Sequence, residues 1–280
     1  MTETFGEKLL VAATTRGRLC VGIDPHASLL EAWGLPVNVE GLEEFSRICV
    51  EAFSDTVALV KPQVAFYERF GSRGFAVLEE TISTLRERGC LVVSDAKRGD
   101  IGSTMAGYAT AWLDPESPLS SDAVTVSPYL GFGSLEPVFE LAERHGRGVF
   151  VLAATSNPEA RVLQDQSNAA GETISQQIVN EAAKLNAPHM AQGKAGNIGV
   201  VVGATLSTPP VLSQLGGAIL MPGVGAQGGT AADVDTIAGD MVHLAFPNVS
   251  RSVLSAGPAV DKLRVSVAET AADFPGFPRS

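Results

Sequence analysis

The stretch Leu91-Val-Val-Ser-Asp-Ala-Lys-Arg-Gly-Asp100 joins an apolar run to a group of charged residues. Its first half is short, continuously apolar and β-branched, which is typical of a strand buried on both faces of a parallel sheet. On such a strand Asp95 and Lys97, two positions apart, would point to the same side. Asp100 follows in the turn before the next helix. The pattern predicts a buried strand that brings charged groups to one end of a sheet.

Seven further apolar runs of this kind follow one another along the chain. They cover residues 19–23, 58–61, 123–126, 149–153, 198–203, 218–221 and one region near 243–252. Helical patterns lie between them, over residues 42–53, 75–88, 103–113, 135–142, 174–185, 211–215, 231–237 and 259–272. Such an alternation of strands and helices predicts a (β/α)8 TIM barrel, and a doubly wound open sheet is the alternative.

Length and composition agree with one barrel domain. The chain has 280 residues, of which 45% are hydrophobic, so it can bury a large core and is not globally disordered. We expect a single α/β domain over residues 1–280, with an N-terminal helical extension. We also expect an insertion at about 157–197 on the active-site face and a short, poorly structured C-terminal tail from Phe274.

Charge and cysteine content limit the partners and the compartment. The formal net charge of −11 opposes binding to nucleic acid or to an anionic membrane. No apolar run approaches the ~18 residues that a membrane helix needs, and the N-terminus does not have the pattern of a signal peptide. Cys20, Cys49 and Cys90 are widely spaced, so we expect them to be reduced and buried. Together these features predict a cytoplasmic protein.

Polar residues follow several of the predicted strands. Asp24 ends the first, Lys61 the second, Asp95 and Lys97 the third, and Ser156 follows the fifth. In a (β/α)8 barrel the chemistry takes place at the C-terminal ends of the strands. Charged side chains there are costly unless they are paired, so their convergence favours an active site. The alternative is a structural ion pair with Asp100 as a helix cap.

The glycine-rich segment Gly223-Val-Gly-Ala-Gln-Gly228 follows the seventh predicted strand. It matches G-x-G-x-x-G, but it lies too late in the chain to begin a dinucleotide-binding βαβ unit. We interpret it as a flexible loop whose backbone N–H groups, including those near Gly223 and Gly225, surround a phosphate. Gln227 can add a side-chain amide, and Arg251 on the eighth strand can add a forked, charge-assisted contact.

Other chemistries have less support in the sequence. The four histidines lack the spacing of metal ligands, and neither a nucleophile-elbow motif nor a nucleotide P-loop is present. We therefore expect no metal and no cofactor.

Four segments together resemble the orotidine 5'-phosphate decarboxylase family, and most closely its longer subgroup from mycobacteria and related bacteria. They are Val60-Lys61, Ser94-Asp-Ala-Lys-Arg-Gly-Asp-Ile-Gly-Ser-Thr104, Pro222-Gly-Val-Gly-Ala-Gln227 and Ser250-Arg251. The resemblance extends from Cys20 to about Ala256. It implies a TIM-barrel lyase that converts orotidine 5'-phosphate to uridine 5'-phosphate (UMP) in pyrimidine biosynthesis, without a cofactor.

The resemblance also implies roles for individual residues. Lys61, Asp95, Lys97 and Asp100 would form the family's charged tetrad, with Lys97 as the proton donor to C6. Asp100 and Thr104 would reach into the site of a neighbouring subunit, which implies a homodimer. Contacts to the substrate would come from Asp24 and Lys61 for the ribose, Ser156 for the pyrimidine, and Gln227, Arg251 and the glycine loop for the phosphate.

Two other functions remain as alternatives. Metal-dependent sugar-phosphate decarboxylases and synthases of the same superfamily share the D-x-K-x-x-D string. They need an acidic residue at the end of the second strand, where this chain has Lys61. The other alternative is a non-catalytic barrel that only binds nucleotides.

Overall fold

Eight parallel strands form a closed barrel in the order β1-β2-β3-β4-β5-β6-β7-β8. The structure, a computed structural model, describes residues 3–277. Pairing of β1 with β8, with Cys20 beside Asn248, closes the ring. The strands are β1 (Cys20–Ile23), β2 (Leu59–Pro62), β3 (Leu91–Arg98), β4 (Ala123–Val126), β5 (Gly148–Ala154), β6 (Ile198–Val202), β7 (Ile219–Pro222) and β8 (Ala245–Val249). The predicted TIM barrel is confirmed, and the open sheet is excluded.

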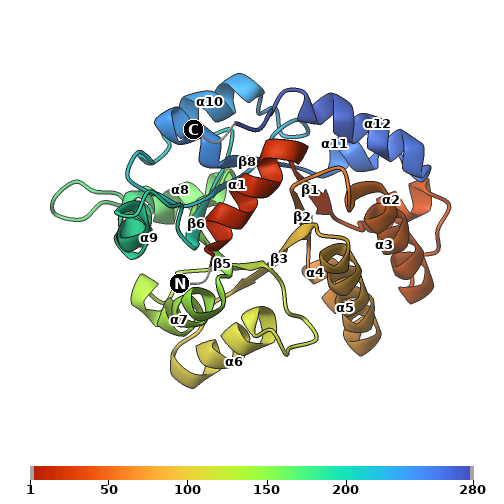
Figure 1. The fold of residues 1–280 in the computed structure, drawn as a ribbon, viewed down its shortest axis with the longest axis horizontal. Helices are drawn as coiled ribbons and strands as arrows, with labels where there is room; N and C mark the ends of the chain where they lie inside the picture. Colours follow the sequence, from red (N-terminus) through yellow and green to blue (C-terminus); the bar gives the residue numbers. More distant parts are fainter. Residues whose placement is uncertain (1–2, 278–280) are drawn as a thin grey trace.

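An outer layer of helices surrounds the barrel (Figure 1). Its longer members are α3 (Val39–Phe53), α5 (Gly71–Glu87), α6 (Gly102–Leu113), α7 (Glu136–His145), α9 (Ile174–Met190), α10 (Ala231–Ala238) and α12 (Val260–Ala271). Local signals set their ends: the Asn38 side chain accepts a hydrogen bond from the N–H of Gly41 before α3, and Gly146 adopts a left-handed conformation after α7.

Short helical segments occupy several connections between the strands and the outer helices. They are α2 (Ala27–Ala32), α4 (Ala65–Glu68), η1 (Phe132–Leu135), η2 (Pro158–Ala160), α8 (Arg161–Gln164), η3 (Gly239–Leu244) and α11 (Arg251–Leu254). None of them was predicted individually from the sequence, because one helical turn has too few residues to show a periodic apolar pattern.

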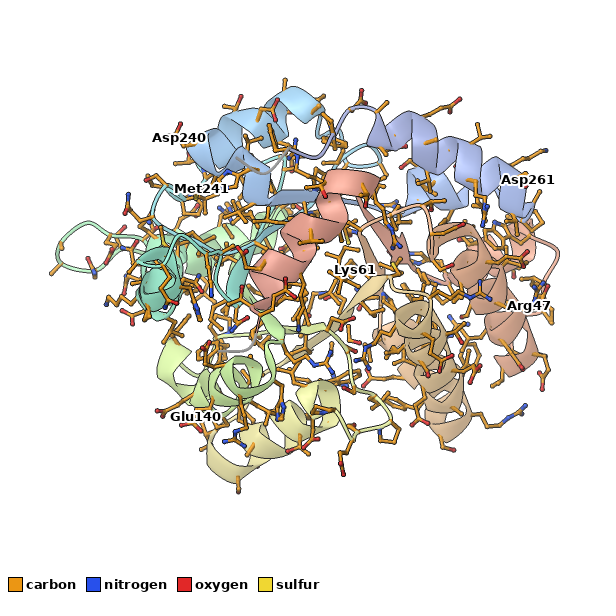
Figure 2. All side chains as sticks on the ribbon, viewed as in Figure 1. Arg47, Lys61, Glu140, Asp240, Met241 and Asp261 are labelled. Carbon is orange, nitrogen blue, oxygen red and sulfur yellow. The ribbon has the colours of Figure 1, made fainter. Side chains whose placement is uncertain are left out.

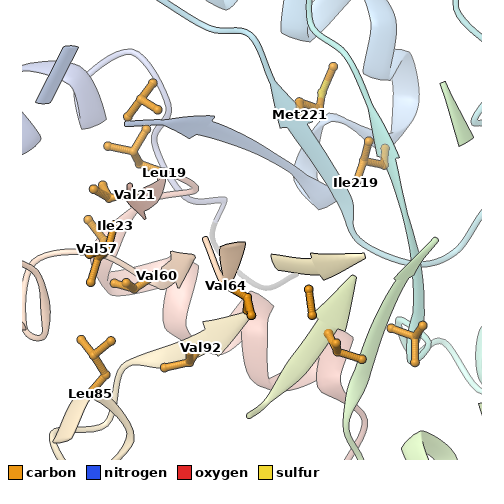
Figure 3. Packing of buried hydrophobic residues seen from close by; sticks show 14 of the residues in the cluster. Leu19, Val21, Ile23, Val57, Val60, Val64, Leu85, Val92, Ile219 and Met221 are labelled. Atoms are coloured by element: carbon orange, nitrogen blue, oxygen red, sulfur yellow. The ribbon is translucent and has the colours of Figure 1, made fainter. Parts of the chain in front are cut away.

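The apolar core has two parts that follow the alternation of side chains along each strand. Residues such as Val21, Val60 and Val92 point outward and pack against the helices (Figure 3). Their neighbours point into the barrel, where Leu59, Val93 and other interior residues form a second cluster. Because each strand is buried on both sides, the strands read as continuous apolar runs.

Helix α1 (Phe5–Arg16) covers the N-terminal end of the barrel and lies across the ring of strands in Figure 1. Its buried residues Phe5, Leu9 and Ala13 join the interior cluster. The rings of Phe5 and Phe150 meet edge to face, with centroids 5.8 Å apart. A Cβ atom at Gly148 would lie 2.4 Å from the Phe5 ring, so glycine is needed for this close packing. The helix closes the end of the barrel opposite the strand ends that carry the charges.

The connection from β5 to β6 contains η2, α8 and α9. Helix α9 contacts both strands and is the crossover helix. Residues 157–173 precede it, and they are joined to the strand end where the Gln164 side chain accepts a hydrogen bond from the Thr155 N–H at 2.8 Å. The segment that exceeds a simple crossover therefore lies next to the C-terminal end of β5.

Two local predictions are wrong. Residues 211–215 form no helix, because the segment lies between Pro209-Pro210 and Gly216-Gly217 and has room for only a single turn. The tail from Phe274 is ordered as far as the structure describes it. Phe274 is buried, and Arg18 donates to the carbonyl groups of Phe274 and Pro275. Residues 278–280 lie outside the described residues.

The three cysteines are free and buried, as expected. Within residues 3–277, no helix combines the length and the apolar character that crossing a membrane requires.

Candidate active site

A cavity of about 640 Å³ opens at the C-terminal ends of the strands. Eight of the predicted site residues line it: Asp24, Lys61, Asp95, Lys97, Ser156, Gly223, Gln227 and Arg251. Their elements come from almost the whole chain, from β1 to the start of α11. Figure 2 labels Lys61 at β2, among the strands of the barrel.

The alternation along the strands explains which side chains reach this cavity. Leu59 and Val93 belong to the interior cluster, so Lys61 and Asp95, two positions later, also point into the barrel. The same rule places Thr125 after the interior residue Ala123, and Asn248 after Phe246. Lys61, Asp95 and Asn248 therefore line the cavity, and Thr125 is joined to it by its hydrogen bond to Asp95.

Asp95 lies at the centre of a buried hydrogen-bond network. Its Oδ2 accepts hydrogen bonds from Lys61 Nζ at 3.0 Å and from Gln63 Nε2 at 2.7 Å. Its Oδ1 accepts from Lys97 Nζ at 2.5 Å and from Thr125 Oγ1 at 2.9 Å. Two cations and two neutral donors therefore fix the orientation of this carboxylate.

The buried pair of Lys61 and Asp95 keeps its charges. Burial is the largest influence on the pKa of Lys61 and lowers it, but the carboxylates of Asp95 and Asp24 outweigh burial and raise this pKa above its ordinary value. Burial raises the pKa of Asp95, but Lys61 and Lys97 outweigh it and hold this pKa well below its usual range. Both groups are therefore ionised at neutral pH.

Lys97 reaches Asp95 by a backbone conformation that a regular strand does not have. Its φ angle is +48°, the one positive value at a non-glycine position in the described part of the chain. Ser94 pairs with Val124, and Arg98 pairs with Val126. The chain therefore advances by four residues on β3 while it advances by two residues on β4. The strand bulges at this point. The Lys97 side chain is 45% exposed, whereas that of Asp95 is 8% exposed. The predicted proximity is present, but the simple alternation does not produce it.

Asp24 provides an acceptor without a donor. Its Oδ1 is buried, has no hydrogen-bond partner within residues 3–277, and lies 3.9 Å from Lys61 Nζ. A buried acceptor without a partner is costly, and a hydroxyl donor in the cavity would satisfy it.

The glycine loop and the β5 end meet across the mouth of the cavity. Ser156 Oγ donates a hydrogen bond to Gln227 Oε1 at 3.0 Å. Gly223 and Gly225 have φ angles of +104° and +71°, which only glycine adopts at low cost. Gly223 lines the cavity, whereas Gly225 does not. Arg251 is the first residue of α11, two positions after β8 rather than on it, and its exposed side chain lies at the rim.

The comparisons with known proteins agree with this geometry. Residues 17–265 match the model of the orotidine 5'-phosphate decarboxylase / HUMPS family. The chain belongs to this family. It is 85% identical over 280 residues, the whole of both chains, to orotidine 5'-phosphate decarboxylase of Corynebacterium efficiens. It is 54% identical over 272 residues, 97% of each chain, to that of Salinispora tropica.

A solved structure shows the same fold. The structure of Leishmania donovani OMP decarboxylase has a TM-score of 0.75 and 30% sequence identity to this chain, and the likeness covers 96% of this chain and 97% of the other.

Two residues of the family motif lie outside the cavity of their own chain. Asp100 Oδ1 accepts a hydrogen bond from the N–H of Ile101 at 2.8 Å, and Thr104 on the first turn of α6 is exposed. Asp100 does not cap this helix, whose N-cap position is Ile101 with no side-chain hydrogen bond. Asp100 and Thr104 therefore do not join Lys61, Asp95 and Lys97 within one chain of this decarboxylase-family protein.

Sequence reasoning missed two polar partners of the motif, Gln63 and Thr125. Around this motif it considered only the charged residues, and both of these are neutral. A usable signal was present, since Gln63 lies two positions after Lys61 and Thr125 interrupts the apolar run of β4. His26 and Phe66 were also missed. Their rings pack with centroids 4.3 Å apart and line the cavity beside Asp24.

Proposed function

We propose that the chain catalyses the decarboxylation of orotidine 5'-phosphate to UMP in pyrimidine biosynthesis, without a cofactor. The observation that carries this proposal is the ammonium of Lys97, 2.5 Å from Asp95 Oδ1, beside the buried Lys61 in the barrel cavity. The full-length identity to named orotidine 5'-phosphate decarboxylases supports the same activity.

The reaction needs fixed charge rather than an electron sink. When the bond between C6 and the carboxylate breaks, CO₂ leaves and the electron pair stays on C6, in the plane of the ring. The ring π system cannot delocalise this pair. A preorganised cation stabilises it, and in a site shielded from water such stabilisation is strong. Lys97 supplies this charge and then transfers a proton from Nζ to C6. Asp95 holds Lys97 in place and lies near the departing carboxylate.

The remaining cavity residues suit the other parts of the substrate. We assign the ribose hydroxyls to Lys61 and Asp24, whose Oδ1 lacks a donor. We assign the pyrimidine to Ser156, and the phosphate to Gln227, Arg251 and the loop that contains Gly223 and Gly225. The hydrogen bond between Ser156 and Gln227 connects the pyrimidine and phosphate ends of the cavity. Binding of the phosphate to the glycine loop then closes this loop over the cavity and excludes water.

We infer that the active form is a homodimer with shared sites. Asp100 and Thr104 lie outside their own cavity, at a surface where Ile101, Tyr129 and Leu130 are 61%, 77% and 54% exposed. A second copy on this surface would bury these apolar side chains and bring Asp100 to the neighbouring cavity, which completes the charged tetrad.

We place this enzyme in the cytoplasm. Three buried free thiols fit a reducing compartment.

The deciding experiment mixes the purified protein with orotidine 5'-phosphate and follows the ultraviolet absorbance of the pyrimidine. We expect conversion to UMP at the same rate with and without EDTA, because Lys61 places a cation where the metal-dependent members of the superfamily need a carboxylate. Absence of turnover would contradict the proposal. Loss of activity in EDTA would favour the metal-dependent alternative.

The assignment of the phosphate is tested with two substrates. Arg251→Ala removes the forked cation at the rim, so kcat/KM for orotidine 5'-phosphate should fall by about ten- to a hundredfold, as expected for a charged hydrogen-bonded pair. The slow reaction of orotidine, which has no phosphate, should stay unchanged. An equal loss with both substrates would contradict this role for Arg251.

A further inference from the structure

The backbone of Lys97 must be held in place by its surroundings. A left-handed conformation costs a non-glycine residue roughly 1–2 kcal/mol, so it persists only where neighbouring contacts impose it. The side chain of Lys97 is nearly half exposed and ends in one contact to Asp95. Packing of the side chain alone therefore does not position the ammonium. The contacts of the flanking peptides decide where it lies.

Two hydrogen bonds fix these peptides to the β4 region. The N–H of Lys97 donates to Thr125 Oγ1 at 2.9 Å, and the carbonyl of Arg98 accepts from the N–H of Ser127 at 2.8 Å. At the next residue, a Cβ atom on Gly99 would lie 2.4 Å from the carbonyl oxygen of Ser127. The bulged segment therefore packs closely against the end of β4. These contacts fix only the side of the segment that faces β4.

The side chain of Arg98 holds the opposite side. Its Nη1 donates to the carbonyl of Ala96 at 3.1 Å, and its Nη2 forms an ion pair with Glu68 of α4. The guanidinium also lies over the rings of Tyr108 and Trp112 of α6, at 5.6 Å and 5.8 Å from their centroids. Arg98 follows Lys97 in the chain, and its side chain donates to the carbonyl of Ala96, which precedes Lys97. The Arg98 side chain therefore fixes the backbone on both sides of the strained residue.

We propose that Arg98 is a positioning residue for Lys97 in the decarboxylation. It fixes the left-handed backbone, so that Lys97 Nζ lies on Asp95 and faces the cavity. Arg98 does not line the cavity, so it acts through Lys97 and not on the substrate. This inference rests on the proposed function.

The geometry of the guanidinium explains why arginine occupies this position. One planar fork donates to a backbone carbonyl and to a carboxylate at the same time, and its flat face covers two aromatic rings. A lysine could keep the charge next to Glu68, but its single ammonium cannot reproduce the whole arrangement. Small displacements matter at this point, since a shift of about 1 Å in a reacting group can cost about a hundredfold in rate.

The test compares Arg98→Lys, Arg98→Met and the wild-type protein. We expect kcat to fall by about tenfold or more in both variants, because Lys97 loses its fixed position, while the Kd for UMP changes by less than about threefold. Arg98→Lys should keep a Tm close to that of the wild type, since it retains the charge beside Glu68. A merely structural role would lower the Tm and the fraction of folded protein, but not kcat per folded site.

The matched control is Arg264 on α12, which pairs with Asp55 far from the cavity. Arg264→Lys and Arg264→Met should leave kcat unchanged. Undiminished kcat per folded site in both Arg98 variants, with an active wild type, would overturn the role of Arg98. A wild-type protein that does not turn over orotidine 5'-phosphate would overturn the proposed function instead.

Discussion

At the scale of single residues, one carboxylate in the cavity organises two ammonium groups. Asp95 accepts hydrogen bonds from Lys61 and Lys97 and also from the neutral donors Gln63 and Thr125. An unpaired charge at this depth would be costly, so each group keeps its partners ionised. The arrangement supplies a fixed cation before any substrate arrives.

Replacement of Lys97 by alanine should separate chemistry from binding. We expect Lys97→Ala to reduce kcat far below a tenth of the wild-type value, since the cation and the proton donor are both lost, and a tenfold loss corresponds to only about 1.4 kcal/mol of barrier. UMP should still bind, as measured by calorimetry. Lys184→Ala, on the exposed face of α9, is the control. A variant that keeps a tenth of the activity would contradict the role of Lys97.

The ionisation of Asp95 predicts how stability depends on pH. Since its pKa is lower in the folded chain than in the unfolded one, its contribution is complete above the unfolded value of about 4 and is lost as the pH falls toward the folded value. The difference in unfolding free energy between the wild type and Asp95→Asn should stay constant above about pH 5. Below about pH 4 it should shrink by up to about 1.4 kcal/mol per pH unit.

Urea denaturation between pH 6 and pH 3 measures this difference. Asp240→Asn, at an exposed position, controls for the loss of one negative charge. A difference that is the same at pH 3.5 and pH 6 would show that Asp95 is not held ionised by its partners.

At the scale of elements, the interior of the barrel is divided along its axis. Polar residues lie at the C-terminal ends of the strands, and apolar residues fill the other end beneath α1. Helix α1 therefore contributes to stability at a distance from the chemistry.

Truncation of Phe5 should destabilise the chain without changing the site. Phe5→Ala removes a buried ring that packs on Phe150, so we expect a loss of roughly 3–5 kcal/mol in unfolding free energy. The kcat of the folded protein should not change. Val11→Ala, at a position of the same helix that is 45% exposed, is the control, and denaturant titration measures both. A loss below about 1 kcal/mol for Phe5→Ala would mean that α1 is not part of the core.

The strands, the cavity and the tail differ in how well they could be predicted from the sequence. Continuous apolar runs predicted all eight strands, because burial on both faces leaves a clear pattern. The polar strand ends and the glycine loop predicted eight of the residues that line the cavity. The bulge at Lys97 could not be predicted, since it depends on contacts to Thr125, Ser127 and Glu68 from distant segments. The ordered conformation of the tail at Phe274 could not be predicted either, because its hydrogen-bond partner Arg18 lies near the other end of the chain.

At the scale of the whole molecule, one chain does not bring together the four residues of the proposed charged tetrad. Lys61, Asp95 and Lys97 meet in one cavity, whereas Asp100 lies outside it. The proposed dimer assigns the missing carboxylate to a second copy.

Mixing two inactive variants tests this sharing. Lys97→Ala and Asp100→Asn homodimers should each have little activity. After unfolding and refolding together, half of the dimers should be hybrids, each with one native site, so activity should return to about a quarter of the wild-type value. Each variant refolded alone is the control. No gain on mixing, with hybrids confirmed by mass spectrometry, would contradict a shared site.

Both ends of the described chain are fastened to the face opposite the cavity. Thr4 at the start of α1 donates a hydrogen bond to Ala195 ahead of β6, and the tail binds Arg18 ahead of β1. A second enzyme or a surface tether could therefore be fused to either end and would project away from the entrance, leaving the route of the nucleotide unobstructed.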